Sequence, residues 1–302
     1  MSFSNLKKNI GAQGIKSLQE ELEKMSKKYG TSDDRFWKLG TDKAGTGAAV
    51  IRFLPESEGE TTPWVLMYKH SFKGPTGLLY IENSLTTLNQ PDPVSEYNRE
   101  LWNSKIEANQ NIARSQNRKN EYISNILVIK DPANPENEGK VFMYKYGKKI
   151  FEKIKSVMFP ENDAIEQKEP MNPFCPWTGA NFKLKVKRVG DYPNYDQSEF
   201  STKEPLFGGD DAKIEALWKT QYKLSSLLDP SNFKTYEQLK DRLDKVVGLK
   251  SHAQPEVKRA APQVTKPSLS ESASLMSDKS SSFSDDDISD DLDYLQQLAN
   301  ED

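Results

Sequence analysis

Only one part of this 302-residue chain is rich enough in aromatic and branched apolar residues to bury a hydrophobic core, namely residues 31–247. That length is ample for one core. The whole chain is only 35% hydrophobic and 29% charged, because polar segments dilute the core region. We therefore expect a folded core over residues 31–250, with a polar arm at residues 1–30 before it and a polar tail at residues 251–302 after it.

The core region alternates short strand-like runs with helical patterns, and Gly, Pro, Asn and Asp residues separate them. Strands are expected at residues 48–54, 64–69, 78–82, 122–130, 140–146 and 181–189. Helices are expected at residues 95–116, 148–158, 212–228 and 236–247. About six short strands with inserted helices predict a mainly β fold with α decoration, an α+β protein built on a small, partly closed β-barrel.

Charge is divided unevenly along the chain. Residues 251–302 hold four basic and eleven acidic residues, so a net charge of −3 for the whole chain conceals a basic body of +4 and a tail of −7. Residues 285–302 contain eight acids and no base, which predicts a disordered segment. Within it Ile288, Leu292, Leu295 and Leu298 recur at helical spacing. That stripe favours an interaction tail over an inert solubilising one, with partner binding expected from Asp285, Asp286, Asp287, Asp290, Asp291, Leu292 and Leu295.

The N-terminal arm has a helical pattern of its own. Ile15, Leu18, Leu22 and Met25 recur at spacings of three and four among several lysines. Two interpretations remain open from the pattern alone, a solvated amphipathic helix or a helix that docks on a neighbouring molecule.

Several functional classes are excluded by what the sequence lacks. No run approaches 18 apolar residues and no signal-peptide core is present at the N-terminus, so we expect a cytoplasmic protein without membrane association. A single cysteine, Cys175, with His70 and His252, cannot supply an internal disulfide or a four-ligand Cys/His zinc site. Phosphate-binding glycine motifs are absent, and GGDD at residues 208–211 fits a turn and helix cap. We expect no enzymatic activity, a carboxylate-based nuclease being the enzyme alternative.

One strand carries a row of like charges. Along residues 182–189, Lys183, Lys185 and Lys187 project from one face while Phe182, Leu184 and Val186 project from the other, because strand side chains alternate. Such a row repels itself unless a polyanion or carboxylates lie opposite. An ordinary solvated sheet face is the alternative.

Tyrosines stand beside amines at three further places in the core region. They are Tyr144 with Lys145 and Lys148, the pair Tyr192 and Tyr195, and Tyr122 after Arg118 and Lys119. A groove for single-stranded nucleic acid needs this combination, since amines neutralise phosphates and rings stack on unpaired bases. The pattern predicts single-strand binding that is indifferent to base sequence. Two alternatives remain: an RNA-binding translational regulator that uses the same groove, and a non-catalytic scaffold that acts through its tail.

Four strings carry a family resemblance: AVIRFLP at residues 49–55, NILVIKDPANPENEGKVF at 125–142, YGKKI at 146–150 and CPWTGANFKLKVK at 175–187. They resemble the single-stranded-DNA-binding, helix-destabilising proteins of T-even bacteriophages. The resemblance implies an oligonucleotide-binding (OB-fold) barrel with an inserted subdomain, cooperative single-strand binding and no catalysis. It also implies that the arm, with Lys7 and Lys8, joins neighbouring molecules on DNA. The tail is implied to recruit phage replication, recombination and repair proteins and to compete for the DNA cleft in the infected cell.

The resemblance also assigns individual residues. The implied DNA-contacting positions are Arg52, Arg118, Lys119, Tyr122, Tyr144, Tyr192 and Tyr195. The family holds a structural zinc with one histidine and three cysteines. Here His70 matches the histidine, whereas Ser84, Asp92 and Ser95 stand where the cysteines belong. We therefore expect no cofactor, and a zinc-free subdomain around residues 60–120 whose loop is held by packing and by the helix after Ser95.

Overall fold

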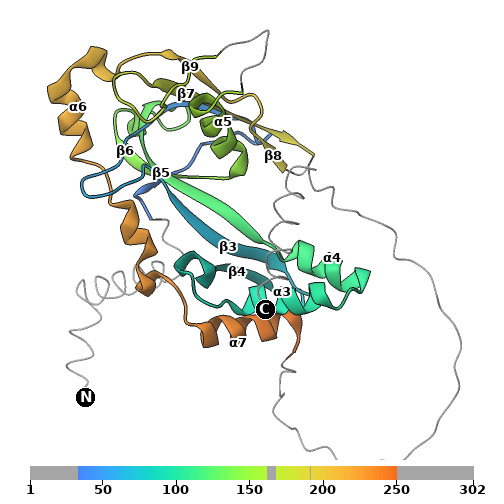
Figure 1. The fold of residues 1–302 in the computed structure, drawn as a ribbon. Helices are drawn as coiled ribbons and strands as arrows, with labels where there is room; N and C mark the ends of the chain where they lie inside the picture. Colours follow the sequence, from blue (N-terminus) through green and yellow to red (C-terminus); the bar gives the residue numbers. More distant parts are fainter. Residues whose placement is uncertain (1–32, 162–167, 191, 250–302) are drawn as a thin grey trace, which may run out of the picture. The chain divides into compact units, whose positions relative to one another are not determined.

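The computed structural model describes residues 33–161, 168–190 and 192–249. Its described part divides into two units (Figure 1). Unit 1 comprises residues 33–64 and 123–222, and unit 2 comprises residues 65–122 and 223–249. The expected arm and tail lie outside the described residues, so Lys7, Lys8 and the tail residues named above have no structural description.

Unit 1 is built on a sheet whose strand order is β1-β6-β5-β2-β7-β8, with β9 also paired to β7. The strands are β1 (Phe36–Trp37), β2 (Gly47–Phe53), β5 (Arg118–Lys130), β6 (Val141–Tyr146), β7 (Ala180–Val189), β8 (Tyr192–Asn194) and β9 (Glu199–Lys203). β5 begins in unit 2 and continues into unit 1. The sheet is open, so the prediction of a barrel is wrong for this structure, while the prediction of a mixed α+β, mainly sheet protein is confirmed.

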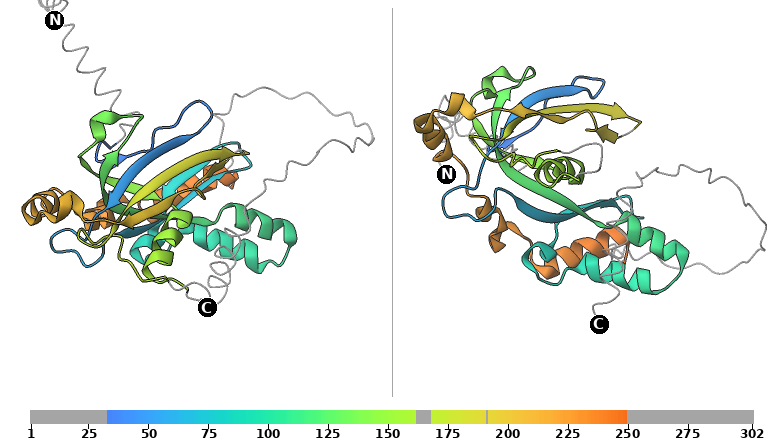
Figure 2. Two further views of the ribbon diagram at one scale, coloured as in Figure 1. Left: turned by 90° about the horizontal axis from the view of Figure 1, so that it is seen from above. Right: turned by 45° about the horizontal axis from the view of Figure 1, so that its top comes forward.

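Two helices belong to unit 1, α5 (Lys148–Met158) and α6 (Asp211–Trp218). Figure 2 shows α5 against one face of the unit 1 sheet, where Ile150 and Ile154 are buried. The core of unit 1 is rich in aromatic residues, with the Phe53 ring 5.6–5.7 Å from the rings of Tyr146, Phe174 and Phe182. Short 3₁₀ helices, η2 (Pro135–Asn137) and η3 (Leu206–Gly209), lie in its connections.

Unit 2 contains the hairpin of β3 (Val65–Lys73) and β4 (Leu79–Asn83) with three helices, α3 (Pro93–Asn103), α4 (Glu107–Ser115) and α7 (Tyr236–Val247). Three 3₁₀ helices, η1 (Leu85–Leu88), η4 (Leu224–Leu228) and η5 (Pro230–Asn232), complete it. Its core joins both ends of the unit's sequence, and the buried residues are Phe72, Tyr80, Leu85, Val94, Leu239, Leu243 and Val246.

Local sequence explains where α7 begins and ends. Thr235 accepts a hydrogen bond from the Gln238 backbone N–H, and the Gln238 side chain accepts one from the Thr235 N–H, forming a capping box. Gly248 ends the helix in the left-handed conformation, with φ of 81°. The expected helix at 95–116 is instead two helices, because Lys105 adopts a left-handed φ of 55° between α3 and α4.

Among the residues that the structure describes, no helix combines the length and the apolar character that crossing a bilayer would need.

Candidate nucleic-acid interface

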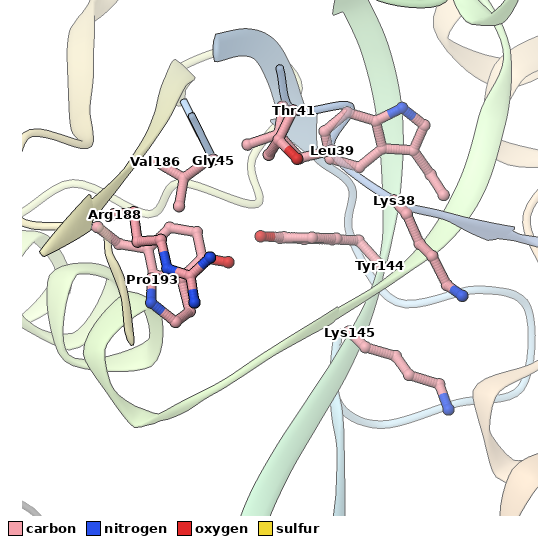
Figure 3. Close-up of a pocket in the computed structure, with 11 residues that line it drawn as sticks. Lys38, Leu39, Thr41, Gly45, Tyr144, Lys145, Val186, Arg188 and Pro193 are labelled. Carbon is pink, nitrogen blue, oxygen red and sulfur yellow. The ribbon is translucent and has the colours of Figure 1, made fainter. Parts of the chain in front are cut away.

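A cavity of about 370 Å³ opens in unit 1. Its walls come from the segment that includes β1, from β6, and from β7 with the residues around β8 (Figure 3). The residues that line it are Trp37, Lys38, Leu39, Thr41, Gly45, Tyr144, Lys145, Val186, Arg188, Pro193 and Tyr195. Segments far apart in the sequence therefore meet at one opening.

The pairing of β1 with β6 sets one wall. These strands run parallel, and their register places Trp37 beside Tyr144. The two rings meet edge to face, with centroids 5.3 Å apart. The Trp37 indole Nε1 donates a hydrogen bond to Asp131 Oδ2 at 2.8 Å, and both residues are buried. Because its ring and its polar edge are both held, Trp37 is a fixed part of the wall.

The cavity is positively charged. Lys38, Lys145 and Arg188 line it, and no Asp or Glu belongs to the described residues of its lining. Lys145 Nζ lies 4.5 Å from the centroid of the Phe36 ring, a cation–π distance. In Figure 3, Lys38 and Lys145 extend to one side of Tyr144, and Arg188 lies on the side toward which the Tyr144 hydroxyl points. A phosphate-bearing strand would thus meet cations on both sides of the ring.

The three tyrosines of unit 1 that the sequence singled out differ in exposure. Tyr144 is only 5% exposed and its ring stacks on that of Tyr146, so it presents an edge to the cavity. Burial raises the pKa of Tyr144 well above its ordinary value, and burial also raises the pKa of Tyr195. Tyr195 is half-buried in the lining, and Tyr192 is 54% exposed on β8. Tyr195 and Tyr192 therefore offer the ring surface on which a base could stack.

The predicted lysine row exists, but it faces away from the cavity. Lys183, Lys185 and Lys187 are all exposed on β7, as the alternation predicted. Val186 and Arg188, which line the cavity, belong to the other face of the strand. Lys183 also pairs with Glu199 on β9 at 3.8 Å. The lysine row therefore lies apart from Tyr144 and Tyr195, which line the cavity, whereas Tyr192 is the register partner of Val189 on the face of the row.

Three of the expected site residues belong to unit 2. The Arg118 guanidinium lies 3.9 Å from the centre of the Tyr68 ring and donates a hydrogen bond to the Thr86 hydroxyl. Lys119 is exposed at the start of β5. Tyr122 is 9% exposed, so the expected stacking of a base on its ring is not available in this structure. Unit 2 thus retains two cations of the predicted set, while its tyrosine is a core residue.

The predicted contact of Arg52 with DNA is not available in this structure, because the side chain is buried. Arg52 is 0% exposed, and its Nη2 donates a hydrogen bond to the Cys175 carbonyl at 2.8 Å. Burial lowers the pKa of the guanidinium. Nη2 therefore holds the backbone turn at Cys175, while Nε and Nη1 are buried without a hydrogen-bond partner among the described residues, so the side chain presents no surface to a phosphate. The remaining predicted residue of unit 1, Lys148, lies at the start of α5, 3.8 Å from Glu152.

Sequence reasoning missed Trp37, Lys38 and Thr41, which line the cavity from the β1 side. A strand of two residues has no periodicity to detect, so nothing in the pattern placed this segment beside β6. The adjacent Trp37 and Lys38 are the aromatic–amine combination used elsewhere in the chain, and they were the available signal. Arg188 directly follows the lysine row in the sequence, but strand alternation puts it on the opposite face of β7.

The four positions of the expected zinc-free subdomain lie in unit 2 and are buried. They are His70, Ser84, Asp92 and Ser95. Asp92 is the N-cap of α3, and Ser84 is the N-cap of η1. In the part of the chain that is described, no three His, Cys, Asp or Glu side chains gather closely enough to hold a metal.

Comparison with known proteins then decides the family. A family model described as "gp32 DNA binding protein like" matches residues 45–247. The single-stranded DNA-binding protein of Enterobacteria phage T2 is 39% identical over 225 residues, covering 73% of this chain and 72% of that protein. The protein of the same name from Enterobacteria phage T4 is 38% identical over 238 residues, covering 76% and 77%. The chain belongs to this family.

Membership confirms the resemblance seen in the four strings. The matched range of the family model begins ahead of β2 and ends with α7, so it includes described parts of both units. It omits residues 33–44 and therefore the segment that brings Trp37 and Lys38 to the cavity. As a member of a family of non-catalytic DNA-binding proteins, the chain is a binding protein rather than an enzyme.

Proposed function

We propose that this chain binds single-stranded DNA without regard to base sequence, and that the unit 1 cavity receives the strand. One observation carries the proposal: three cations and the accessible ring of Tyr195 line an opening that has no lining carboxylate among the described residues. The names of the T2 and T4 relatives support the choice of nucleic acid. RNA binding is the alternative outcome that the experiment below separates.

The chemistry divides between charge and stacking. Lys38, Lys145 and Arg188 neutralise phosphates and release the counterions that those phosphates held. Tyr195 stacks on a base through the ring surface that remains accessible in the cavity. Each stacked base contributes about 1–3 kcal/mol and any base can supply it, so binding is insensitive to sequence. A duplex hides its base faces, so the same cavity discriminates against double strands.

The finer functions rest on the sequence and the family resemblance. We propose that Lys7 and Lys8 in the arm contribute to cooperative self-association along DNA. The acidic tail, residues 285–302, recruits replication, recombination and repair proteins and competes with DNA for the basic cavity. These activities would take place in the cytoplasm of a phage-infected bacterial cell.

A fluorescence titration tests the proposed binding function. The full-length chain is titrated with a single strand, the matching duplex and the matching RNA, each at a low and a high salt concentration, following tyrosine and tryptophan emission. We expect the single strand to bind more tightly than the duplex, with affinity falling as salt rises. Equal affinity for single strand and duplex, or affinity independent of salt, contradicts the proposal. Tighter binding of RNA favours the alternative.

Two alanine substitutions, one inside and one outside the cavity, test whether the cavity is the DNA-binding site. Tyr195→Ala removes an accessible ring from the cavity, and Phe159→Ala removes an exposed ring of unit 1 that does not line it. We expect only the first to weaken single-strand binding, by about 1–3 kcal/mol on mixed sequence and on a homopolymer alike. Equal effects of the two variants would place the strand elsewhere.

A further inference from the structure

The Asp92 carboxylate of unit 2 is an acceptor for backbone groups from two separate segments. Its Oδ1 accepts hydrogen bonds from the N–H groups of Val94 and Ser95, at 3.0 and 3.2 Å. Its Oδ2 accepts one from the N–H of Leu85, at 3.0 Å. Asp92 is 1% exposed. A single buried side chain therefore joins the first turn of α3 to the first turn of η1.

His70 extends this connection to β3 and to the end of α4. Its Nε2 lies 3.5 Å from Asp92 Oδ1, and its Nδ1 lies 2.9 Å from the carbonyl oxygen of Gln116. Because a carbonyl oxygen only accepts, Nδ1 carries the hydrogen of that contact. The Asn98 side chain donates a second hydrogen bond to the same carbonyl, at 3.3 Å. Four segments of unit 2 thus meet around Asp92 and His70.

The environment favours an ionised Asp92. Burial on its own raises the pKa of the carboxyl, but His70 and the backbone N–H groups of Leu85 and Ser95 outweigh it and hold the pKa below its usual value. Hydrogen bonds to a charged acceptor are about twice as strong as neutral ones. The buried carboxylate accepts three backbone N–H groups, so it is a strong centre for a small subdomain.

The residues present do not fit a structural zinc ion. Such a site takes four ligands from Cys, His, Asp and Glu. Around His70 the described residues offer only Asp92 from that set, together with the Ser84 and Ser95 side chains. The Ser84 hydroxyl is 3.0 Å from the Thr86 hydroxyl, and the Asp92 oxygens already accept three backbone N–H groups.

We propose that the buried Asp92–His70 pair holds unit 2 together in place of a metal ion, so that this subdomain folds without zinc. The pair joins β3, η1, α3 and the end of α4 through its own hydrogen bonds and one close contact. The inference is independent of the proposed DNA-binding function.

Metal content and chelation test the first half of the proposal. The full-length chain is produced with zinc in the medium, its bound zinc is measured by mass spectrometry, and its thermal unfolding is followed by circular dichroism with and without EDTA. We expect no stoichiometric zinc and an unchanged midpoint. About one zinc per chain together with a lower midpoint in EDTA would overturn the proposal.

Two helix-capping aspartates test the second half. Asp92→Asn keeps a capping oxygen but places an amide where Leu85 N–H needs an acceptor, whereas Asp210→Asn alters the exposed N-cap of α6 in unit 1. We expect Asp92→Asn to lower the unfolding midpoint by several degrees more than Asp210→Asn, or to prevent folding where Asp210→Asn does not. Equal midpoints for the two variants overturn the proposal.

A third variant keeps the test decisive if Asp92→Asn does not fold. His70→Gln retains a donor toward the Gln116 carbonyl but loses the imidazole beside Asp92. We expect its unfolding midpoint to fall by several degrees and to remain unaffected by EDTA. A midpoint equal to that of the wild type contradicts a structural role of the pair.

Discussion

Trp37 and Tyr144 are register partners in the parallel pairing of β1 with β6, and their rings meet edge to face at 5.3 Å. Trp37 stands directly before Lys38, and Tyr144 directly before Lys145. The pairing therefore brings two aromatic–lysine dipeptides, over a hundred residues apart, to one side of the same cavity. Each dipeptide alone is a weak indication of nucleic-acid binding, and their shared position makes the cavity a candidate DNA site.

The buried hydrogen bond between Trp37 and Asp131 predicts a loss of stability when the indole is replaced. Trp37→Phe leaves the buried Asp131 without the indole donor, so we expect the free energy of unfolding to fall by about 1–3 kcal/mol. Trp177→Phe is the matched control, because the Trp177 indole donates to Asp211 at the surface. Urea unfolding measures both. A control as damaging as Trp37→Phe would refute the assigned role of the buried hydrogen bond.

Tyr144 and Tyr195 should separate stability from binding. Tyr144→Ala removes a ring packed against Trp37 and Tyr146, so we expect a lower unfolding midpoint together with weaker binding. Tyr195→Ala removes a half-buried ring, so we expect the larger part of its effect to be on affinity. Parallel melting and DNA titrations check this division. The account is contradicted if Tyr144→Ala leaves the midpoint unchanged.

The salt dependence of binding should report which lysines touch phosphates. Each phosphate contact on a single strand contributes about 0.7 to the slope of log affinity against log salt. We expect Lys38→Gln to reduce the magnitude of that slope by about this amount. Lys185→Gln, on the face of β7 away from the cavity, should leave it nearly unchanged. The reverse order would move the DNA path to the lysine row.

Removal of the acidic tail should strengthen DNA binding. Residues 285–302 carry eight acids, and under the proposed function these acids compete with phosphates for the basic cavity. We expect truncation after residue 284 to raise single-strand affinity most at low salt, where screening is weakest. Affinity that is unchanged by truncation at low salt would count against this competition.

The longer elements could be predicted from sequence because periodicity and capping residues mark them. All six expected strands are present, and the helices at 148–158 and 236–247 have the predicted bounds. The three missed strands, β1, β8 and β9, have two, three and five residues. Segments that short become strands only through their partners β6 and β7, so the sequence carries no period to detect.

The residue types of the candidate site could be predicted from the sequence, but only some of their positions could. The sequence predicted a site of aromatic and basic residues, and Tyr144, Lys145 and Tyr195 from that set line one cavity in the structure. The burial of Arg52 could not be predicted, because an arginine is usually exposed and only the structure shows that β2 is buried on both faces at Ile51, Arg52 and Phe53. The lysine row was confirmed as exposed, yet its face could not be related to the tyrosines before the order of β2, β7 and β8 was known.

Protection of individual lysines from acetylation tests the central claim most directly. The full-length chain is acetylated briefly with and without a saturating single strand, and each lysine is quantified by mass spectrometry. We predict strong protection of Lys38 and Lys145 in the cavity, with Lys213 on α6 modified equally in both samples. Unchanged acetylation of Lys38 and Lys145 in the DNA complex would contradict the assignment of the cavity as the DNA site.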